Sequence, residues 1–520
     1  MPIARHILGV AWAAAAATFW AGCGDGGGPG STLPPTTALP PIEDAGVRET
    51  ATTIASRDVV LLVGTVLTPE GPIDGEVLVE GPRITCVAKG QGCRGRDVVG
   101  RASVIDTGGV IAPGLIDTHN HILFDVFDND DWLPEKAYQN HDQWTLEPRY
   151  GAMLDVKQCL ANDSQGKPAW CAQTPYGTRE GSLRCEMDKW GELKGLIAGT
   201  TSIVGLPGTS AACFGSLARS ADVAQNGLDE DRVQTSATFP PSNATGVCQN
   251  FQNQTSEAFL VHCGEGLDQK SKNEFATLGA SSTPANCLYA AQTTITHGTA
   301  FTATEFQTMA QAGMKLTWSP ASNIALYGDT TNIPLARESG VLVALGPDWS
   351  MGGSQNLLDE LRFARDWDAA KWGGKLTSRE LVTMATENGA KVLAVEDKLG
   401  AIKEGLLADL VVFAGGAKDP YDAVVTATPK QVRLVMVGGV ALYGDQEFKA
   451  IGPEKPGCED LDICGKSKFL CVATTATTDK LGQTFAEIKD ALENAMVAAD
   501  GATPNDGWSF APLAPLVKCP

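Results

Sequence analysis

The sequence predicts an α/β protein whose central parallel sheet or (β/α)8 barrel is flanked by a small β-sandwich that both ends of the chain build. Between about residues 113 and 398, short apolar strands alternate with amphipathic helices, the pattern of a parallel sheet or a barrel. Short β-rich segments separated by Gly and Pro turns precede this region and return after it, at 409–413 and 432–439. One sandwich completed from both ends is the simplest interpretation.

The first 23 residues have the pattern of an export signal. Arg5 lies near the start, an apolar stretch follows at 7–20, and the segment ends in Ala-Gly-Cys at 21–23. This ending resembles a bacterial lipoprotein signal, which implies cleavage before Cys23 and a lipid on that residue. An ordinary secretory signal cleaved nearby is the alternative. We therefore expect an exported protein that is lipid-anchored to a bacterial membrane, on its periplasmic or cell-surface side.

Composition narrows the classes of partner. Lys and Arg number 40 against 61 Asp and Glu, which gives a formal net charge of −21 and argues against nucleic-acid binding. A Gly, Pro and Thr-rich stretch at 24–53 is typical of a flexible linker. No later segment has about twenty uninterrupted apolar residues, so we expect a soluble body that contacts the membrane only through the lipid.

The chain contains 14 cysteines, which favour an oxidising compartment and disulfide bonds. Without Cys23 an odd number remains, and Cys263 is our candidate for the unpaired residue. Cys86 with Cys93, and Cys458 with Cys464, are close enough in sequence to close small loops, although spacing alone does not fix connectivity.

Elements of the central region follow from apolar periodicity. One helix begins with a Thr302-x-x-Glu305 capping box, and another carries an apolar face from residue 357. Two further strands fit only loosely, near 221–225 and 232–238. The other predicted strands are 201–204, 259–262, 293–297, 314–318 and 341–345. The predicted units are a signal peptide (1–23), a linker (24–53), two sandwich halves (54–112 and 399–450), a barrel (113–398) and a cysteine-containing extension (451–520) with a helix at 484–499.

Polar residues that end the apolar segments form the candidate site. His119 and His121 are one residue apart, so on a strand both side chains point to the same face. His262, His297 and Asp348 end later strands, and a barrel gathers the carboxyl ends of its strands at one mouth. Three imidazoles and a carboxylate suit a zinc ion, because they form a nitrogen-rich shell with room for a water that the zinc activates.

These motifs together resemble the amidohydrolase superfamily, in the branch of cytosine and guanine deaminases and triazine hydrolases. The resemblance covers about residues 53–450. The quoted motifs are Pro-Gly-Leu-Ile-Asp-Thr-His-Asn-His (113–121), His-Cys-Gly-Glu (262–265), His-Gly (297–298), Ser-Pro-Ala-Ser-Asn (319–323), Leu-Gly-Pro-Asp (345–348), Ala-Thr-Glu-Asn-Gly-Ala (385–390) and residues 400–410.

The resemblance implies a (β/α)8 TIM barrel and a role for each site residue. The implied metal ligands are His119, His121, His262 and Asp348. Glu265 would shuttle protons, His297 would orient or polarise the water or the substrate, and Asp348 could also accept the proton of the water. Members of this superfamily that hold two metals usually bridge them with a carboxylated lysine on the fourth strand, and no lysine occurs here between Gly205 and His262. The resemblance therefore implies one divalent metal, Zn²⁺ with Fe²⁺ as the alternative.

The expected function is hydrolysis of a non-peptide C–N bond in a cyclic amidine or amide, as in a deaminase, with a small molecule as substrate. The alternative is a surface-tethered ligand-binding protein on an inactive amidohydrolase scaffold. Oligomeric state is left open, with a homodimer as one candidate.

A long insertion at 122–199 separates the first and second strands of the predicted barrel. Loops after barrel strands shape substrate pockets, so we expect this segment to cover the mouth. It contains His141, which we interpret as a surface or loop residue. Trp349 and Met351 follow Asp348 and either line the pocket or pack in the core. Because neighbouring side chains on a strand point to opposite faces, the side chain of Cys263 should point away from the face on which His262 lies.

Overall fold

The computed structural model describes residues 52–162, 166–205, 217–223, 228, 233–454, 456–473, 482–503 and 507–519. The predicted signal peptide, its lipid-attachment residue Cys23 and all but the last two residues of the predicted linker lie outside the described residues.

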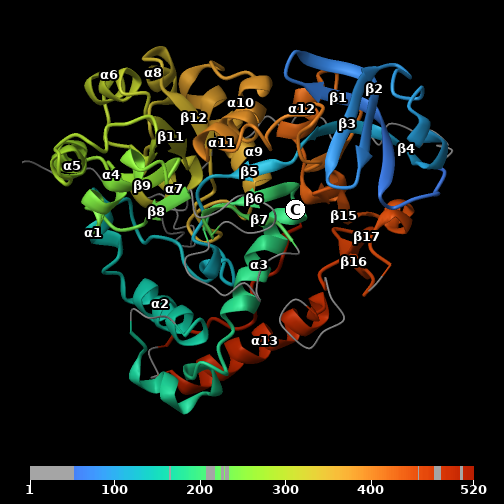
Figure 1. The fold of residues 1–520 in the computed structure, drawn as a ribbon. Coiled ribbons are helices and arrows are strands. Elements are labelled where there is room, and N and C mark those ends of the chain that lie inside the picture. The colour runs from blue at the N-terminus through green and yellow to red at the C-terminus, as the bar shows by residue number, and fades with distance from the viewer. Residues whose placement is uncertain are drawn as a thin grey trace, which may run out of the picture.

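The two ends of the chain build a common β domain, as predicted, and the sandwich expected from the sequence is here one continuous sheet. Strands from both ends form one continuous sheet, with the first four and the last five lying side by side in Figure 1. Its order is β16-β17-β15-β14-β13-β4-β1-β2-β3. The strands are β1 (Val59–Thr68), β2 (Gly71–Glu80), β3 (Arg83–Lys89), β4 (Ser103–Pro113), β13 (Leu410–Ala414), β14 (Val432–Val437), β15 (Val440–Asp445), β16 (Glu459–Ile463) and β17 (Lys466–Leu470).

The junction between the two ends is the antiparallel pair β4 and β13, in which Ala112 lies opposite Val411. The sheet also extends past the predicted boundary at residue 450, because β17 pairs with β15 and β16 completes the edge. Part of the C-terminal extension is therefore continuous with the β domain.

Strand β1 is buried on both faces, which explains its unbroken apolar sequence. Val60 and Leu62 belong to the main hydrophobic core, whereas Val59 and Leu61 pack into a smaller cluster on the other face. That smaller cluster contains the disulfide-bonded pair Cys86 and Cys93.

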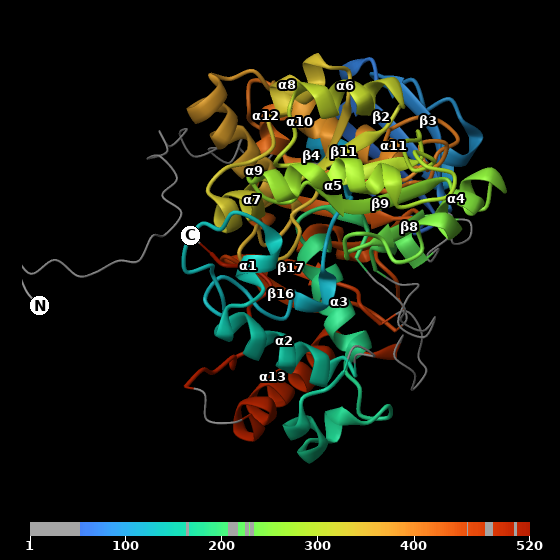
Figure 2. The same ribbon diagram turned by 90° about the vertical axis from the view of Figure 1, so that its left-hand side faces the viewer.

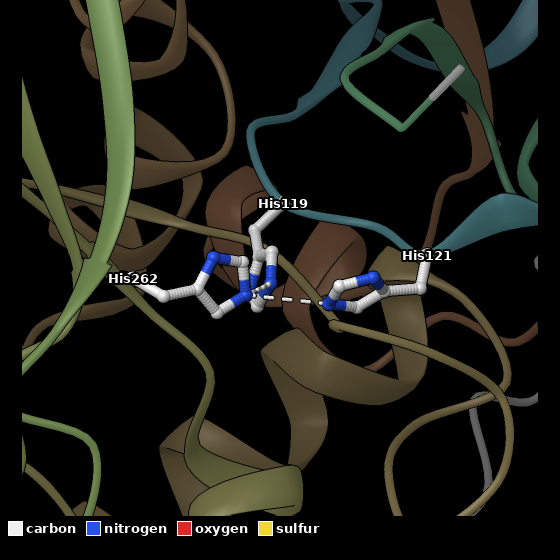
Figure 3. A group of neighbouring side chains, drawn as sticks. All are labelled: His119, His121 and His262. Carbon is white, nitrogen blue, oxygen red and sulfur yellow. Dashed lines mark hydrogen bonds between the residues drawn. The ribbon is translucent and has the colours of Figure 1, made fainter. Parts of the chain in front are cut away.

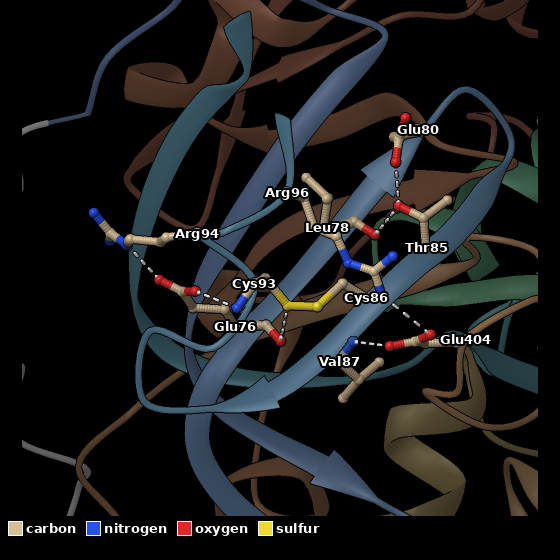
Figure 4. Close-up of a disulfide and its surroundings, with 10 residues drawn as sticks. All are labelled: Glu76, Leu78, Glu80, Thr85, Cys86, Val87, Cys93, Arg94, Arg96 and Glu404. Carbon is tan, nitrogen blue, oxygen red and sulfur yellow. Dashed lines mark hydrogen bonds and ion pairs between the residues drawn. A yellow bond between two sulfur atoms is a disulfide. The ribbon is translucent and has the colours of Figure 1, made fainter. Parts of the chain in front are cut away.

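The Cys86–Cys93 disulfide fastens the loop after β3 to the sheet (Figure 4). Buried Glu76 on β2 accepts a hydrogen bond from the backbone N–H of Cys93 at 3.3 Å and pairs with Arg94 at 2.7 Å. A carboxylate is tolerated inside this small domain because both of its oxygens have partners.

Eight strands of the central region run parallel. They are β5 (Leu115–Asp117), β6 (Thr200–Ile203), β7 (Arg219–Ser220), β8 (Val233–Ser236), β9 (Ala258–Cys263), β10 (Thr293–His297), β11 (Lys315–Trp318) and β12 (Leu342–Leu345). In the described residues they form a three-stranded sheet, β5-β6-β7, and a five-stranded sheet, β8 to β12. The last and first strands are linked by a bridge between Asn120 and Asp348 and by a hydrogen bond from the Thr118 N–H to the Leu345 carbonyl. This arrangement confirms the predicted α/β class.

One loosely placed strand lies elsewhere than predicted. The strand expected near 221–225 is β7, at residues 219–220, and Ala221–Val223 forms a 3-10 helix. Periodicity missed it because β7 begins with Arg219, a charged residue that is buried. Asp409 neutralises this guanidinium through hydrogen bonds of 2.7 and 2.8 Å.

Helices cover the parallel strands (Figure 1). The predicted capping box is confirmed, since Thr302 and Glu305 cap the helix that follows them. The helices are α4 (Ala244–Gln252), α5 (Gln269–Ala280), α6 (Ala303–Gln311), α7 (Pro320–Tyr327), α8 (Ile333–Glu338), α9 (Leu357–Trp367), α10 (Ser378–Met384) and α11 (Glu387–Val392). A further helix, α12 (Pro420–Val425), contacts α9 and α10 and strands β1, β4 and β13 of the β domain.

The insertion after β5 and the C-terminal extension pack together below the parallel strands in Figure 2. The insertion contributes α1 (His141–Trp144), α2 (Pro148–Leu160) and α3 (Arg184–Leu196), and the extension contributes α13 (Phe485–Ala502). Helix α13 contacts both α2 and α3, and the rings of Phe485 and Trp190 stack at 6.0 Å. Over the residues that the structure describes, we find no helix with the length and apolarity that crossing a bilayer requires.

Disulfide bonds cross-link several of these segments. The predicted Cys86–Cys93 pair is present, but the suggested Cys458–Cys464 pair is wrong. Cys458 is bonded to Cys471 and Cys464 to Cys519, because β16 and β17 form a hairpin that places the first pair side by side and leaves Cys464 at its tip. Further bonds join Cys159 to Cys171 and Cys248 to Cys287. Cys263 is the free cysteine of the described chain, as predicted, and is buried.

Candidate metal centre

His119 and His121 lie just beyond the carboxyl end of β5. They are outside the strand itself, yet they point to one place, because the bridge between Asn120 and Asp348 keeps this segment extended. The Nε2 atom of each lies 3.3 Å from Oδ1 of Asp348. The expected orientation therefore arises from pairing with the segment after β12.

His262, near the end of β9, reaches the same point from the opposite side (Figure 3). Its Nε2 lies 3.0 Å from Nε2 of His119 and 3.3 Å from Nε2 of His121. Its Nδ1 lies 3.1 Å from the carbonyl oxygen of Ser236, which can only accept a hydrogen bond. The ring therefore carries its proton on Nδ1 and directs the lone pair of Nε2 toward the other two histidines.

Asp348 lies against two of these histidines, and His119, His297 and Asp348 form a second group of possible metal ligands among the described residues. Oδ2 of Asp348 accepts a hydrogen bond from the Ser322 hydroxyl at 2.5 Å. Its Oδ1 is buried and has no hydrogen-bond partner among the described residues. A buried carboxylate oxygen without a donor is costly, so this atom requires either a proton or a cation.

The donor set fits a divalent metal ion. Zinc binds nitrogen and oxygen ligands at about 2.0–2.2 Å, and two ligands in tetrahedral geometry are then about 3.3–3.5 Å apart. Nε2 of His262 lies 3.0 and 3.3 Å from Nε2 of His119 and His121, and Oδ1 of Asp348 lies 3.3 Å from the same two nitrogens. Imidazole nitrogens and a carboxylate oxygen that converge on one point in this way suit a bound cation.

Burial keeps the imidazoles in the form that binds metals. It lowers the pKa of His119 and of His121 well below the ordinary value, and the neighbouring imidazoles lower both further. The pKa of His262 falls to about 4, through burial first and His297 second. These side chains are therefore neutral at physiological pH, with free lone pairs. The pKa of Asp348 is raised well above its usual value by burial, a cost that a neighbouring cation would remove.

His297 and Glu265 lie beside this cluster. His297 ends β10, and its Nδ1 donates to Oδ1 of Asn323 at 2.9 Å, since the amide nitrogen of Asn323 already donates to Thr330. Its Nε2 lies 3.9 Å from Glu265 Oε1, and burial lowers its pKa to about 3. Glu265 accepts a hydrogen bond from the Tyr327 hydroxyl at 2.6 Å. The structure thus brings all six predicted site residues of the barrel together.

Residues 319–323 belong to one of the quoted motifs but had no predicted role, and Tyr327 was missed; helix α7 supplies most of the residues that hold this site in place. Ser319 precedes the helix and lies 2.9 Å from His119 Nδ1. Ser322, Asn323 and Tyr327 bind Asp348, His297 and Glu265, respectively. Positions 319, 322, 323 and 327 follow helical spacing, so the periodicity of these polar residues could have identified one face of a helix directed at the site.

The insertion covers the site, as expected. The Tyr138 N–H donates to the carbonyl of Leu326, and the indole N–H of Trp144 donates to the Tyr327 hydroxyl at 2.9 Å. Trp349 packs against His121 with ring centroids 5.3 Å apart and also contacts Trp144. Trp349 therefore lies beside the candidate metal ligands and also packs against aromatic side chains of the insertion.

The interpretation of His141 as a surface or loop residue is wrong. His141 begins α1 and lies over the site, with its Nδ1 3.9 Å from Glu265 Oε2 and its Nε2 3.0 Å from Glu274 Oε1. The insertion folds back onto the carboxyl ends of the strands, a contact that local sequence does not encode. Cys263 is buried, and burial raises the pKa of its thiol, consistent with a structural role.

The geometry defines a candidate site for a divalent metal on a parallel α/β scaffold. Residues 249–442 match the amidohydrolase family. A 5-methylthioadenosine/S-adenosylhomocysteine deaminase of Desulfitobacterium hafniense is 26% identical over 428 residues, which span 75% of this chain and 95% of the relative. The homologous enzyme of Halobacterium salinarum is also 26% identical, over 74% of this chain and 92% of its own.

Two solved structures share the fold. Atrazine chlorohydrolase from Arthrobacter aurescens, complexed with zinc, gives a TM-score of 0.55 at 18% identity, covering 76% of this chain and 96% of its own. Guanine deaminase of E. coli gives 0.52 at 15% identity, covering 74% and 99%. The family match and the relatives named as deaminases confirm the resemblance to the amidohydrolase superfamily and its deaminase-like branch, and the two solved structures show the shared fold.

Proposed function

We propose that this protein is a mononuclear zinc hydrolase that deaminates a planar cyclic amidine or opens a cyclic amide. The observation that carries the proposal is the buried, unpartnered Oδ1 of Asp348 at 3.3 Å from two histidine nitrogens. Relatives named as deaminases of adenine-containing nucleosides support the C–N bond as the target, and the zinc in the atrazine chlorohydrolase structure supports the choice of metal.

His119, His121, His262 and Asp348 would hold the ion. When bound, zinc lowers the pKa of a coordinated water toward neutrality. Only one ion is proposed, since no lysine that could bridge a second one occurs between Gly205 and His262.

Glu265 is placed to move the proton. Its Oε1 is held by Tyr327, which leaves Oε2 free to take a proton from the attacking water and pass it to the substrate nitrogen. His297 carries its proton on Nδ1, so its Nε2 accepts a hydrogen bond and can orient the water or a substrate N–H. C–N cleavage needs such a proton path, because an amine leaves only once its nitrogen is protonated.

A ligand-binding protein on an inactive scaffold is less well supported. Binding alone would not require Glu265, Tyr327 and Trp144 to form a connected hydrogen-bond chain beside a complete ligand set.

The test is elemental analysis of the purified protein together with activity on adenine nucleosides and triazines. We expect about one zinc per chain, lost in His119→Ala. Glu265→Gln should retain zinc while turnover falls about 10²–10⁴-fold, because the proton path is removed and the ligands remain. Normal turnover by Glu265→Gln, or a folded, zinc-replete preparation that binds no metal, would contradict the proposal.

We also propose that the mature chain begins at a lipid-modified Cys23 and is exported. The support is the signal-like sequence at 1–23 and the presence of several disulfides, which persist in oxidising compartments. Expression of the full chain and of Cys23→Ala, followed by membrane fractionation, tests it. Equal membrane retention of both would contradict it.

A further inference from the structure

The candidate metal ligands are reached from one side. The side chain of His121 is 26% exposed, whereas those of His119 and Asp348 are 5% and 3% exposed. Trp349 packs beside His121, with ring centroids 5.3 Å apart, and is itself buried. A small molecule that comes to these ligands from solvent therefore passes His121 and lies beside Trp349.

Tyr150, on helix α2 of the insertion, lies next to Trp349. Its ring is 8% exposed and packs among four aromatic side chains. The ring centroid lies 5.0 Å from that of Trp144, 5.2 Å from Trp132, 6.3 Å from Trp349 and 6.4 Å from Phe124. Because the C–O bond of a phenol lies along the axis of its ring, a ring held in this way keeps its hydroxyl in one place.

The hydroxyl of Tyr150 has no hydrogen-bond partner in the described part of the chain. Tyrosine hydroxyls of buried rings usually have one. Tyr327, which shares Trp144 as a neighbour, shows the ordinary case, since its hydroxyl donates to Glu265 at 2.6 Å and accepts from the Trp144 indole at 2.9 Å. The Tyr150 hydroxyl is therefore available to a ligand.

This hydroxyl lies close to the groups that carry the proposed chemistry. Burial raises the pKa of Tyr150, and the carboxylates of Asp348 and Glu265 each raise it further. These two carboxylates come from different segments on either side of the site, so a phenol that both of them influence lies beside the space between them. The phenol stays protonated at neutral pH and acts there as a hydrogen-bond donor.

We propose that Tyr150 is a substrate-binding residue that donates a hydrogen bond to an acceptor atom of a planar heterocycle. The inference rests on the proposed function and narrows its substrate class to rings with an acceptor nitrogen or carbonyl oxygen. The substrate nitrogen that is protonated lies at Glu265, so the acceptor for Tyr150 lies on another edge of the ring. Aromatic side chains around the hydroxyl suit a flat ring, which can pack against them.

Tyr150→Phe in the zinc-loaded enzyme tests this contact, because it removes the hydroxyl and keeps the packed ring. We expect kcat/KM for adenosine to fall about 3–10-fold, the usual effect of one lost neutral hydrogen bond, with zinc content unchanged. Tyr176→Phe is the matched control. Tyr176 lies in the same insertion, and burial alone raises its pKa, without the site carboxylates. It should keep the wild-type kcat/KM, and a fall equal to that of Tyr150→Phe would overturn the proposal.

Analogues that lack one acceptor separate a substrate contact from a structural effect. In 3-deazaadenosine and 7-deazaadenosine, a C–H group replaces one ring nitrogen away from the amino group. We expect Tyr150→Phe to lose its defect with one of the two analogues and to keep it with the other. A defect of the same size for adenosine and for both analogues would contradict a hydrogen bond to the ring.

A binding measurement without turnover separates this inference from the proposed function. Quenching of tryptophan fluorescence in the zinc-loaded protein gives the affinity for adenosine and for each analogue. If nothing is hydrolysed but Tyr150→Phe weakens adenosine binding and leaves one analogue unaffected, the substrate contact stands and the reaction class fails. Unchanged adenosine affinity in Tyr150→Phe, or a wild-type protein that binds neither adenosine nor atrazine, would refute the substrate contact.

Discussion

His297 and Asp348 adopt backbone conformations that few residues other than glycine adopt. Their φ angles are +72° and +74°, in the left-handed region, which costs about 1–3 kcal/mol for each residue. Hydrogen bonds hold both in place, from the Thr331 hydroxyl to the His297 carbonyl and from the Asp348 N–H to the His119 carbonyl. The surrounding structure therefore stabilises strained residues where chemistry needs their side chains aimed at one point.

His297 also predicts a dependence of stability on pH. Its pKa is about 3 in the folded protein against 6.5 ordinarily, because burial disfavours the charged ring. Between these values the unfolded chain binds a proton that the folded chain does not, so this residue makes stability fall as pH decreases from 6.5 toward 3. The slope is at most about 1.4 kcal/mol per pH unit.

Thermal unfolding of metal-free protein between pH 7 and pH 4 measures this effect. Wild type should lose stability more steeply than His297→Gln, which has no titrating ring at this position. Parallel curves for the two proteins would show that the ring is not held neutral.

At the level of elements, one helix organises the site. Helix α7 supplies Ser322 to Asp348, Asn323 to His297 and Tyr327 to Glu265, while Ser319 at its N-cap contacts His119. Four side chains that end or follow different strands are thus oriented by a single rigid element. Groups that orient metal ligands commonly tune metal affinity as strongly as they tune geometry.

Ser322→Ala tests this role. Loss of the hydroxyl leaves Asp348 Oδ2 without its donor, so zinc affinity should fall about 10–100-fold while the fold is retained. Competition with a chelator measures the change. Half-buried Ala325 on the same helix provides the control, and Ala325→Ser should keep wild-type affinity. Equal affinities in Ser322→Ala and wild type would show that Asp348 is not oriented by α7.

At the level of the whole molecule, the C-terminal segment is fastened to the insertion. Phe510 packs on Phe127 with ring centroids 5.7 Å apart, and Lys518 lies 2.9 Å from Asp128. The Cys464–Cys519 disulfide joins the end of this segment to the β16–β17 hairpin. The insertion over the site is therefore held by both the barrel and the end of the chain.

Removal of that disulfide should lower stability. Cross-links stabilise more when they close longer loops, and Cys464–Cys519 spans 55 residues against 7 for Cys86–Cys93. The chain-entropy relation makes the long-loop bond worth about 2 kcal/mol more. The double serine variant at 464 and 519 should therefore unfold at a lower temperature than the one at 86 and 93. The reverse order in calorimetry would contradict this reasoning.

Much of the site could be predicted from local sequence. His119, His121, His262, His297 and Asp348 follow or end apolar strands, and parallel strands bring their carboxyl ends together, so their position in each segment predicted the cluster. Helix α6 was predictable for a similar reason, since Thr302 and Glu305 satisfy its first N–H groups locally.

The sequence by itself determined the α/β class, the shared β domain, the free cysteine and the set of residues at the candidate metal centre, because periodicity and strand ends are local properties of the chain. Only the tertiary structure decided that α7 orients those residues, that His141 meets Glu265 and that Cys464 pairs with Cys519. These contacts join segments far apart in sequence, and their partners are selected by packing and by the need to satisfy buried polar groups.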